Sequence, residues 1–253
     1  MVKLIAVATL ALVAQLAATP AGTPVPVLLE LFTSEGCSSC PPADDVLTRL
    51  VSTQPVAGAQ VIALGEHVDY WDHLGWRDAF SSATFSRRQT EYAERVFRGG
   101  NVYTPQLVIN GRQEVVGSDY RGAVAAISKA AKTPARLRVS LSVDNAPNPT
   151  ANISVASADG TPFKKSADVW LAVVENGLTT KVARGENSGR TLQHSAVVRT
   201  IRDLATVDVK STTWTGNVPV AIAADWNRAK ILLVAFAQDR SSREILGAAA
   251  TRP

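Results

Sequence analysis

The sequence predicts an α/β domain in the first half of the chain, followed by an all-β, sandwich-like domain in the second half. Two observations support this prediction. In residues 25–131, apolar strand-like runs alternate with segments whose apolar side chains recur at helical spacing. In residues 137–248, short alternating strands are separated by turn-rich stretches. The pattern changes from alternating strands and helices to strands alone after Thr133-Pro134. We therefore expect one domain at residues 23–134 and another at residues 135–253.

The elements of the first half are expected in the order strand, helix, strand, helix, strand, hairpin strand, helix. Compact apolar runs predict the strands, at residues 25–32, 60–64, 106–109 and 112–116. Asn110-Gly111 joins the last two, because this dipeptide favours a tight hairpin turn. Helical spacing predicts the helices, at residues 41–51, 85–96 and 120–131. Strands of the second half are expected at residues 137–143, 153–156, 169–174, 192–201, 231–237 and 245–248.

The first 22 residues have the pattern of a secretory signal peptide. Lys3 precedes an apolar run over residues 4–18, and small and turn-forming residues follow at 19–22. This run is shorter than the roughly 20 apolar residues that a membrane-spanning helix needs, although an uncleaved anchor is the alternative. We expect cleavage between Ala17 and Gly22, export to the periplasm or the exterior, and no stable membrane insertion afterwards.

Composition excludes several classes of function. The hydrophobic content of 46% and charged content of 19% fit a globular protein, and the formal net charge is +4. The basic residues are scattered and form no stripe for phosphates, so nucleic-acid binding is not predicted. Haem-attachment, phosphate-loop, dinucleotide and zinc-protease motifs are missing, so we predict no cofactor and no metal. The oligomeric state is not predicted.

Cys37 and Cys40 are the only cysteines of the chain. A bridge across two residues closes so small a loop that it constrains the unfolded chain little, which favours a chemical role over a structural one. The start of a helix lowers the pKa of a thiol below about 8.5, so we assign Cys37 as the nucleophile and Cys40 as the resolving thiol. Ser38 and Ser39 supply no cation to stabilise a thiolate further, which predicts a potential that is not extremely oxidising.

Two further segments supply candidate side chains. If the strands at 25–32 and 60–64 are parallel, both end at one edge of the sheet, where ligands bind in open α/β sheets. His67, Tyr70 and Trp71 follow the second strand, so we predict that they contact substrate or relay protons near Cys37. The alternative is that His67 is structural and the two aromatic residues serve packing.

Thr104-Pro105 opens the third strand. A Cys-x-x-Cys at the first strand-to-helix turn, with a proline before the third strand, resembles the thioredoxin fold. The resemblance implies a cis Pro105 beside the disulfide, with catalytic roles for Cys37, Cys40 and Pro105 and a substrate contact at Thr104. A local structural disulfide, a metal site at the cysteines and an ordinary trans proline are the alternatives.

Residues 31–44, 67–72 and 102–106 are similar to a family of exported bacterial proteins, catalogued as a domain of unknown function within the thioredoxin-like superfamily. The likeness extends to Gly185-Glu186-Asn187 and His194 in the second half. It implies an α/β thioredoxin-like N-terminal domain and export, but no activity. His194 itself is expected to be structural or at the surface.

The sequence therefore favours an enzyme, an exported thiol–disulfide oxidoreductase acting on protein or small-molecule thiols and disulfides. One alternative is a Cu(I)-binding or copper-delivery protein that uses the cysteines with a histidine such as His67, because thiolates suit Cu(I). Another is a non-catalytic binding module in which the second half recognises a partner.

Overall fold

The computed structural model describes residues 23–144 and 146–253, so the predicted signal peptide lies outside the described residues. The first half forms β1 (Val25–Thr33), α1 (Pro41–Thr53), β2 (Ala59–His67), α2 (Ala83–Arg95), β3 (Gln106–Ile109), β4 (Gln113–Val116) and α3 (Tyr120–Ala131). The second half forms β5 (Leu137–Val143), β6 (Thr150–Ser157), β7 (Ala167–Glu175), β8 (Leu178–Lys181), β9 (Thr191–His194), β10 (Val197–Val207), β11 (Thr213–Pro219), β12 (Ile231–Asp239) and β13 (Ile245–Thr251), with a 3-10 turn at Arg228–Lys230.

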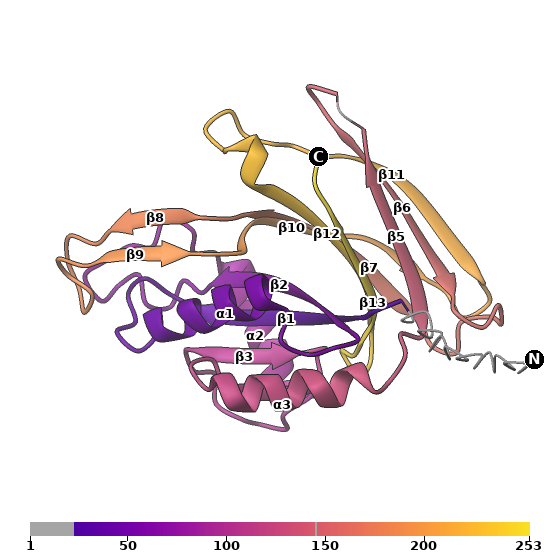
Figure 1. Cartoon of the computed structure of the whole chain (residues 1–253), viewed down its shortest axis with the longest axis horizontal. Coiled ribbons are helices and arrows are strands. Elements are labelled where there is room, and N and C mark those ends of the chain that lie inside the picture. The colour runs from indigo at the N-terminus through magenta and orange to yellow at the C-terminus, as the bar shows by residue number, and fades with distance from the viewer. Residues whose placement is uncertain (1–22, 145) are drawn as a thin grey trace, which may run out of the picture.

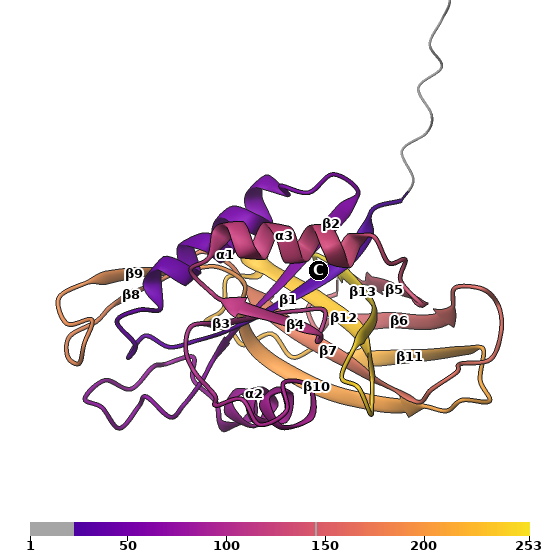
Figure 2. The same cartoon turned by 90° about the horizontal axis from the view of Figure 1, so that it is seen from below.

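One mixed sheet of eight strands runs through the molecule, in the order β13-β12-β7-β10-β2-β1-β3-β4 (Figure 1). β1 and β2 are parallel and β3 is antiparallel to β1, while β7, β10, β12 and β13 continue the sheet from the second half. A three-stranded sheet, β11-β6-β5, packs its apolar face against β7 and β12 and forms a second core. β8 and β9 form a separate hairpin beside α1 (Figures 1 and 2).

The two halves meet where β2 pairs with β10. The backbone N–H of Gly65 donates to the carbonyl of Ala196 over 2.6 Å, next to the pair Gly65–Val197. A Cβ atom at position 65 would lie 3.2 Å from the carbonyl oxygens of Ser195 and Ala196. A residue without a side chain therefore allows the second half to approach β2 this closely.

The predicted fold class is wrong. An α/β thioredoxin-like domain followed by an all-β sandwich-like domain would give each half its own sheet, whereas the structure is mostly β and the large sheet contains strands from both halves. The order of elements in the first half is as expected, because it follows from local apolar patterns. The pairing of β2 with β10 joins residues far apart in sequence, which such patterns do not encode. The boundary near residue 134 falls in the turn between α3 and β5 and stays a prediction.

Helices cover both faces of the first-half strands. Figure 2 shows α1 and α3 on one side of the sheet and α2 on the other. Pro41 and Pro42 occupy the first turn of α1, where a missing N–H costs little, and the Ser82 hydroxyl caps α2 by accepting from Thr84 N. Among residues 23–144 and 146–253, no helix combines the length and apolarity that crossing a membrane requires.

Arg88 of α2 is buried and ties this helix to both halves of the sheet. Its guanidinium pairs with Glu30 of β1, donates to Gln238 of β12 over 3.1 Å and donates to the Tyr92 hydroxyl over 3.2 Å. Burial, and after it repulsion from Glu30, raises the pKa of Glu66 well above its usual range. Arg88 Nε lies 3.6 Å from Glu66 Oε1, so Glu30 is the nearer carboxylate partner of Arg88.

Replacing Arg88 tests this arrangement. Arg88→Met should lower the free energy of unfolding by about 3–5 kcal/mol, because Glu30 would be left as a buried charge without its partner. Arg87→Met is the matched control, since Arg87 is the exposed neighbour on the same helix. Equal urea midpoints for the two variants would contradict the role assigned to Arg88.

Candidate redox site

Cys37 and Cys40 lie in the turn that joins β1 to α1 and form a disulfide, with their Cα atoms 5.4 Å apart. Cys40 is the N-terminal cap residue of α1, and two prolines follow it. Both cysteine side chains are fully buried, whereas Ser38 and Ser39 between them are exposed. Exposed backbone and hydroxyl groups therefore adjoin a covered disulfide.

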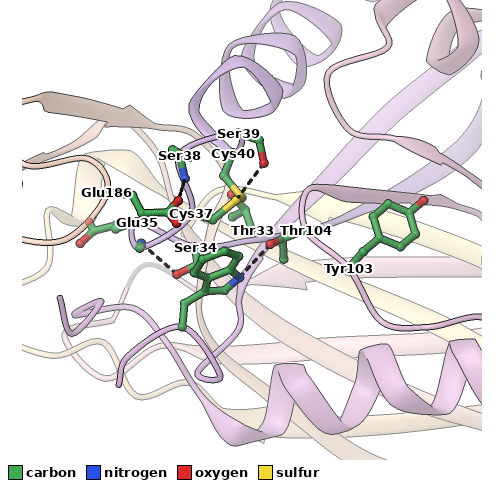
Figure 3. Close-up of a disulfide and its surroundings, with 12 residues drawn as sticks. Thr33, Ser34, Glu35, Cys37, Ser38, Ser39, Cys40, Tyr103, Thr104 and Glu186 are labelled. Atoms are coloured by element: carbon green, nitrogen blue, oxygen red, sulfur yellow. Dashed lines mark hydrogen bonds between the residues drawn. A yellow bond between two sulfur atoms is a disulfide. The ribbon is translucent and has the colours of Figure 1, made fainter. Parts of the chain in front are cut away.

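Local hydrogen bonds set the shape of this turn. Cys37 N donates to the carbonyl of Ser34, and Cys40 N donates to the carbonyl of Cys37, each over 3.2 Å. The Ser39 hydroxyl lies 3.3 Å from Cys37 Sγ, and it is directed at that sulfur in Figure 3. Ser39 is thus placed to donate a hydrogen bond to Cys37 when the disulfide opens.

Thr104 lies beside the disulfide, and Tyr103 points away from it (Figure 3). The peptide bond between Thr104 and Pro105 is cis, the form that the resemblance implied. The Trp71 indole donates to the Thr104 hydroxyl over 2.9 Å. A Cβ atom at Gly36 would lie 3.1 Å from Trp71 Cβ, so the cysteine turn and the Trp71 segment are in direct contact.

His67 and Tyr70 have other neighbours. His67 Nδ1 lies 2.6 Å from Asp78 Oδ2, and the same carboxylate oxygen accepts from Glu35 N over 2.9 Å. His67 is therefore linked to the cysteine turn through Asp78. The Tyr70 hydroxyl donates to Gln89 Oε1 of α2 over 3.0 Å, and burial raises the pKa of Tyr70 to about 12.

Three titratable side chains, Glu35, Asp44 and His194, form a buried ionic unit next to the cysteines. His194 Nε2 lies 3.2 Å from Glu35 Oε1, and His194 Nδ1 lies 3.6 Å from Asp44 Oδ2. Trp76 donates to the other Glu35 oxygen over 2.7 Å, and the Thr33 hydroxyl donates to Asp44 over 3.3 Å. His194 ends β9, so the second half of the chain supplies the cation of this unit.

The electrostatics of the histidines follow from these pairings. Burial alone would lower the pKa of His194, but the hydrogen bonds and charges of Asp44 and Glu35 outweigh it and raise the pKa to about 9. Burial alone would raise the pKa of Asp78, but the charge of His67 and the hydrogen bonds that Asp78 accepts lower it. The centres of the His67 and His194 rings lie 5.1 Å apart, so the His67–Asp78 pair is in contact with the buried ionic unit.

The loop between β8 and β9 also reaches the cysteine turn. The amide of Asn187, fully buried, donates to the carbonyls of Glu35 and Cys37 over 2.8 and 2.9 Å. The Glu186 carboxylate accepts from the backbone N–H of Ser38 over 2.9 Å (Figure 3). Hydrogen bonding by the Ser38 side chain, and after it by the Ser38 backbone N–H, lowers the pKa of Glu186.

The structure thus groups most of the predicted site residues and adds others. Thr104 and Trp71 lie at the disulfide, His67 is linked to it through Asp78, and Tyr70 hydrogen bonds to α2. Sequence reasoning missed Glu35, Asp44, Glu186, Asn187 and His194. One signal was present, since Gly185-Glu186-Asn187 and His194 belong to the segments that carry the family resemblance in the second half. The catalytic and substrate-contact roles of the predicted residues stay predictions.

Among the described residues, the side chains around the disulfide are not grouped as metal ligands. Across residues 23–144 and 146–253, no three or more His, Cys, Asp or Glu side chains are grouped as a metal ion requires. Nδ1 of His67, the histidine of the copper hypothesis, lies against Asp78.

Two solved structures resemble this chain along most of its length. A crystal structure of an Agrobacterium tumefaciens protein is 28% identical, with a TM-score of 0.68 over 90% of this chain and 94% of that one. HBP35 of Porphyromonas gingivalis is 14% identical, with a TM-score of 0.65 over 90% of this chain and 75% of that one, a likeness of fold alone. No curated protein matches the chain. A family model described as "Protein of unknown function (DUF1223)" matches residues 28–238, and the chain therefore belongs to that family.

Proposed function

We propose that this protein is a thiol–disulfide oxidoreductase that uses Cys37 and Cys40 on protein or small-molecule thiols and disulfides. The observation that carries the proposal is the placement of the disulfide at the start of α1, against the buried ionic unit. A bridge that only stapled residues 37 and 40 would stabilise the fold little. A purely structural bridge would also not require a titratable histidine from the second half of the chain beside it.

In the reducing direction, the Cys37 thiolate attacks a substrate disulfide. A Cys37–substrate disulfide forms, and one substrate sulfur leaves as a thiolate. The Cys40 thiol then loses its proton and attacks Cys37 Sγ, which closes the Cys37–Cys40 disulfide and releases the second substrate thiolate. The protein dithiol gives up two electrons and two protons, and the substrate disulfide becomes a dithiol. The reverse sequence oxidises a substrate dithiol.

The buried ionic unit supplies what the second step needs. Cys40 is fully buried, so its proton has to pass to a group of the protein rather than directly to water. Asp44 lies one helical turn after Cys40 and its backbone N–H donates to the Cys40 carbonyl over 3.2 Å. The unit contains two carboxylates, Asp44 and Glu35, and one histidine, His194. When one carboxylate accepts the proton of Cys40, the positive charge of His194 still neutralises the other carboxylate.

Export to an oxidising compartment is part of this proposal. Its support is the signal-peptide pattern of residues 1–22. Protein disulfides form and persist mainly in such compartments, so disulfide substrates would be available there. Nothing in the geometry favours the copper hypothesis or the non-catalytic binding module over thiol exchange.

Trapping distinguishes the roles of the two cysteines. Cys40→Ala should accumulate a mixed disulfide with glutathione or a substrate protein, because the resolving thiol is missing. Cys37→Ala is the matched control and should accumulate at least about tenfold less, because it lacks the residue assigned as the nucleophile and keeps only the resolving thiol. Intact-protein mass spectrometry before and after dithiothreitol measures both. Equal adducts on the two variants, or none on either, would contradict the assignment.

The pKa of His194 predicts how stability depends on pH. Because this pKa is 6.5 ordinarily and about 9 in the folded protein, the folded state holds the proton more tightly. The resulting stability is fully present below pH 6.5 and is lost as the pH rises through 9. Between about pH 6 and pH 10, the oxidised wild type should lose about 2–3 kcal/mol more free energy of unfolding than His194→Gln.

Urea unfolding at several pH values checks this difference. His73→Gln is the control, because His73 is exposed and should keep the pH dependence of the wild type. A His194→Gln variant whose stability falls as steeply with pH as that of the wild type would show that His194 is uncharged in the folded protein.

A further inference from the structure

The loop between β8 and β9, residues 182–190, is held firmly against the cysteine turn. The Asn187 amide bridges the carbonyls of Glu35 and Cys37, and its oxygen accepts from Arg190 over 2.7 Å, which fixes the orientation of the amide. Gly185 has a φ of 76°, and a Cβ atom there would lie 3.1 Å from Trp76 Cβ. The Glu186 side chain is exposed, but its chain neighbours Gly185 and Asn187 are both held in place by these contacts. Its carboxylate is itself held by the hydrogen bond from Ser38 N.

We propose that the Glu186 carboxylate tunes the redox pair by disfavouring the Cys37 thiolate, which makes the disulfide harder to reduce. This inference rests on the proposed thiol–disulfide exchange. It also assigns a role to the second half of the chain, since that half supplies the tuning charge.

The first argument concerns hydrogen-bond donors. A thiolate at the start of a helix is stabilised by backbone N–H groups that no carbonyl uses. Pro41 and Pro42 have no N–H, and Cys40 N already donates to the Cys37 carbonyl. Ser38 N is the first donor after Cys37, and Glu186 takes it. The site thus withholds from Cys37 one of the few N–H groups that this stretch of chain offers.

The second argument concerns charge. Glu186 pairs with the residue next to Cys37, so its negative charge lies close to any thiolate formed there. Hydrogen bonds from the Ser38 side chain and backbone N–H lower the pKa of Glu186, so the carboxylate is ionised at neutral pH. Repulsion between the two anions raises the energy of the thiolate and hence of the reduced protein. Glu35, Asp44 and His194 also carry charge near the pair, and a change at Glu186 leaves them in place.

The test compares Glu186→Gln with the wild type. Glutamine keeps an acceptor for Ser38 N and removes only the charge. Glu94→Gln is the matched control, because Glu94 is an exposed glutamate on α2 and loses the same charge. In a Cys40→Ser background, the ultraviolet absorbance of the thiolate against pH reports the pKa of Cys37. With both cysteines present, a glutathione or dithiothreitol series reports the equilibrium between disulfide and dithiol.

Glu186→Gln should lower the pKa of Cys37 and shift the exchange equilibrium toward the dithiol by about three- to tenfold, as expected for two charges a few ångströms apart in water. A tenfold shift makes the potential about 30 mV less negative. The shift should shrink in about 1 M salt, where charges are screened beyond about 3 Å. Glu94→Gln should change neither quantity.

An unchanged or raised pKa of Cys37 in Glu186→Gln would overturn the inference, as would an equal shift in Glu94→Gln. These outcomes are separate from the proposed function. If Cys40→Ala traps no mixed disulfide, the oxidoreductase proposal fails, yet the effect of Glu186 on the Cys37 thiolate is still measured by absorbance.

Discussion

The hydrogen bond from Gly65 to the carbonyl of Ala196 is the contact on which the site depends. It brings the end of β2 against the start of β10, at a position where a side chain would prevent the approach. His67 and His194 each lie two residues away from this bond on their own segments, and their rings are 5.1 Å apart as a result. His194 in turn meets Glu35 and Asp44 beside the cysteines. One backbone contact between the halves therefore assembles the ionic part of the site.

The charges around the disulfide are arranged in two layers. Buried carboxylates near the cysteine turn are paired with histidines, as groups removed from water have to be. On the exposed side, Glu186 faces Ser38, and no cation stands there among the residues that hydrogen bond to the turn. The expectation of a pair that is not extremely oxidising, drawn from Ser38 and Ser39, stays a prediction. The two halves of the chain thus contribute different parts of one electrostatic environment.

Local features of this structure were predictable, and long-range ones were not. The apolar runs and Asn110-Gly111 located the first-half strands, and the cysteine spacing located the disulfide. The sharing of one sheet by both halves was missed, because alternation along a strand reveals its buried face but not its partner. The neighbours of His194 were not predictable for the same reason. Its chemistry depends on Glu35 and Asp44, and nothing near residue 194 in the sequence indicates that they are its neighbours.

The reduction potential of Cys37–Cys40 in the mature protein tests the central claim most directly. The measurement equilibrates the protein with defined ratios of reduced and oxidised thiol and counts free thiols after acid trapping. Thiol exchange predicts a reversible two-electron transition within about −120 to −270 mV, the range of known exchangers. A disulfide that stays closed well below about −300 mV would contradict the account and identify the bridge as a structural one.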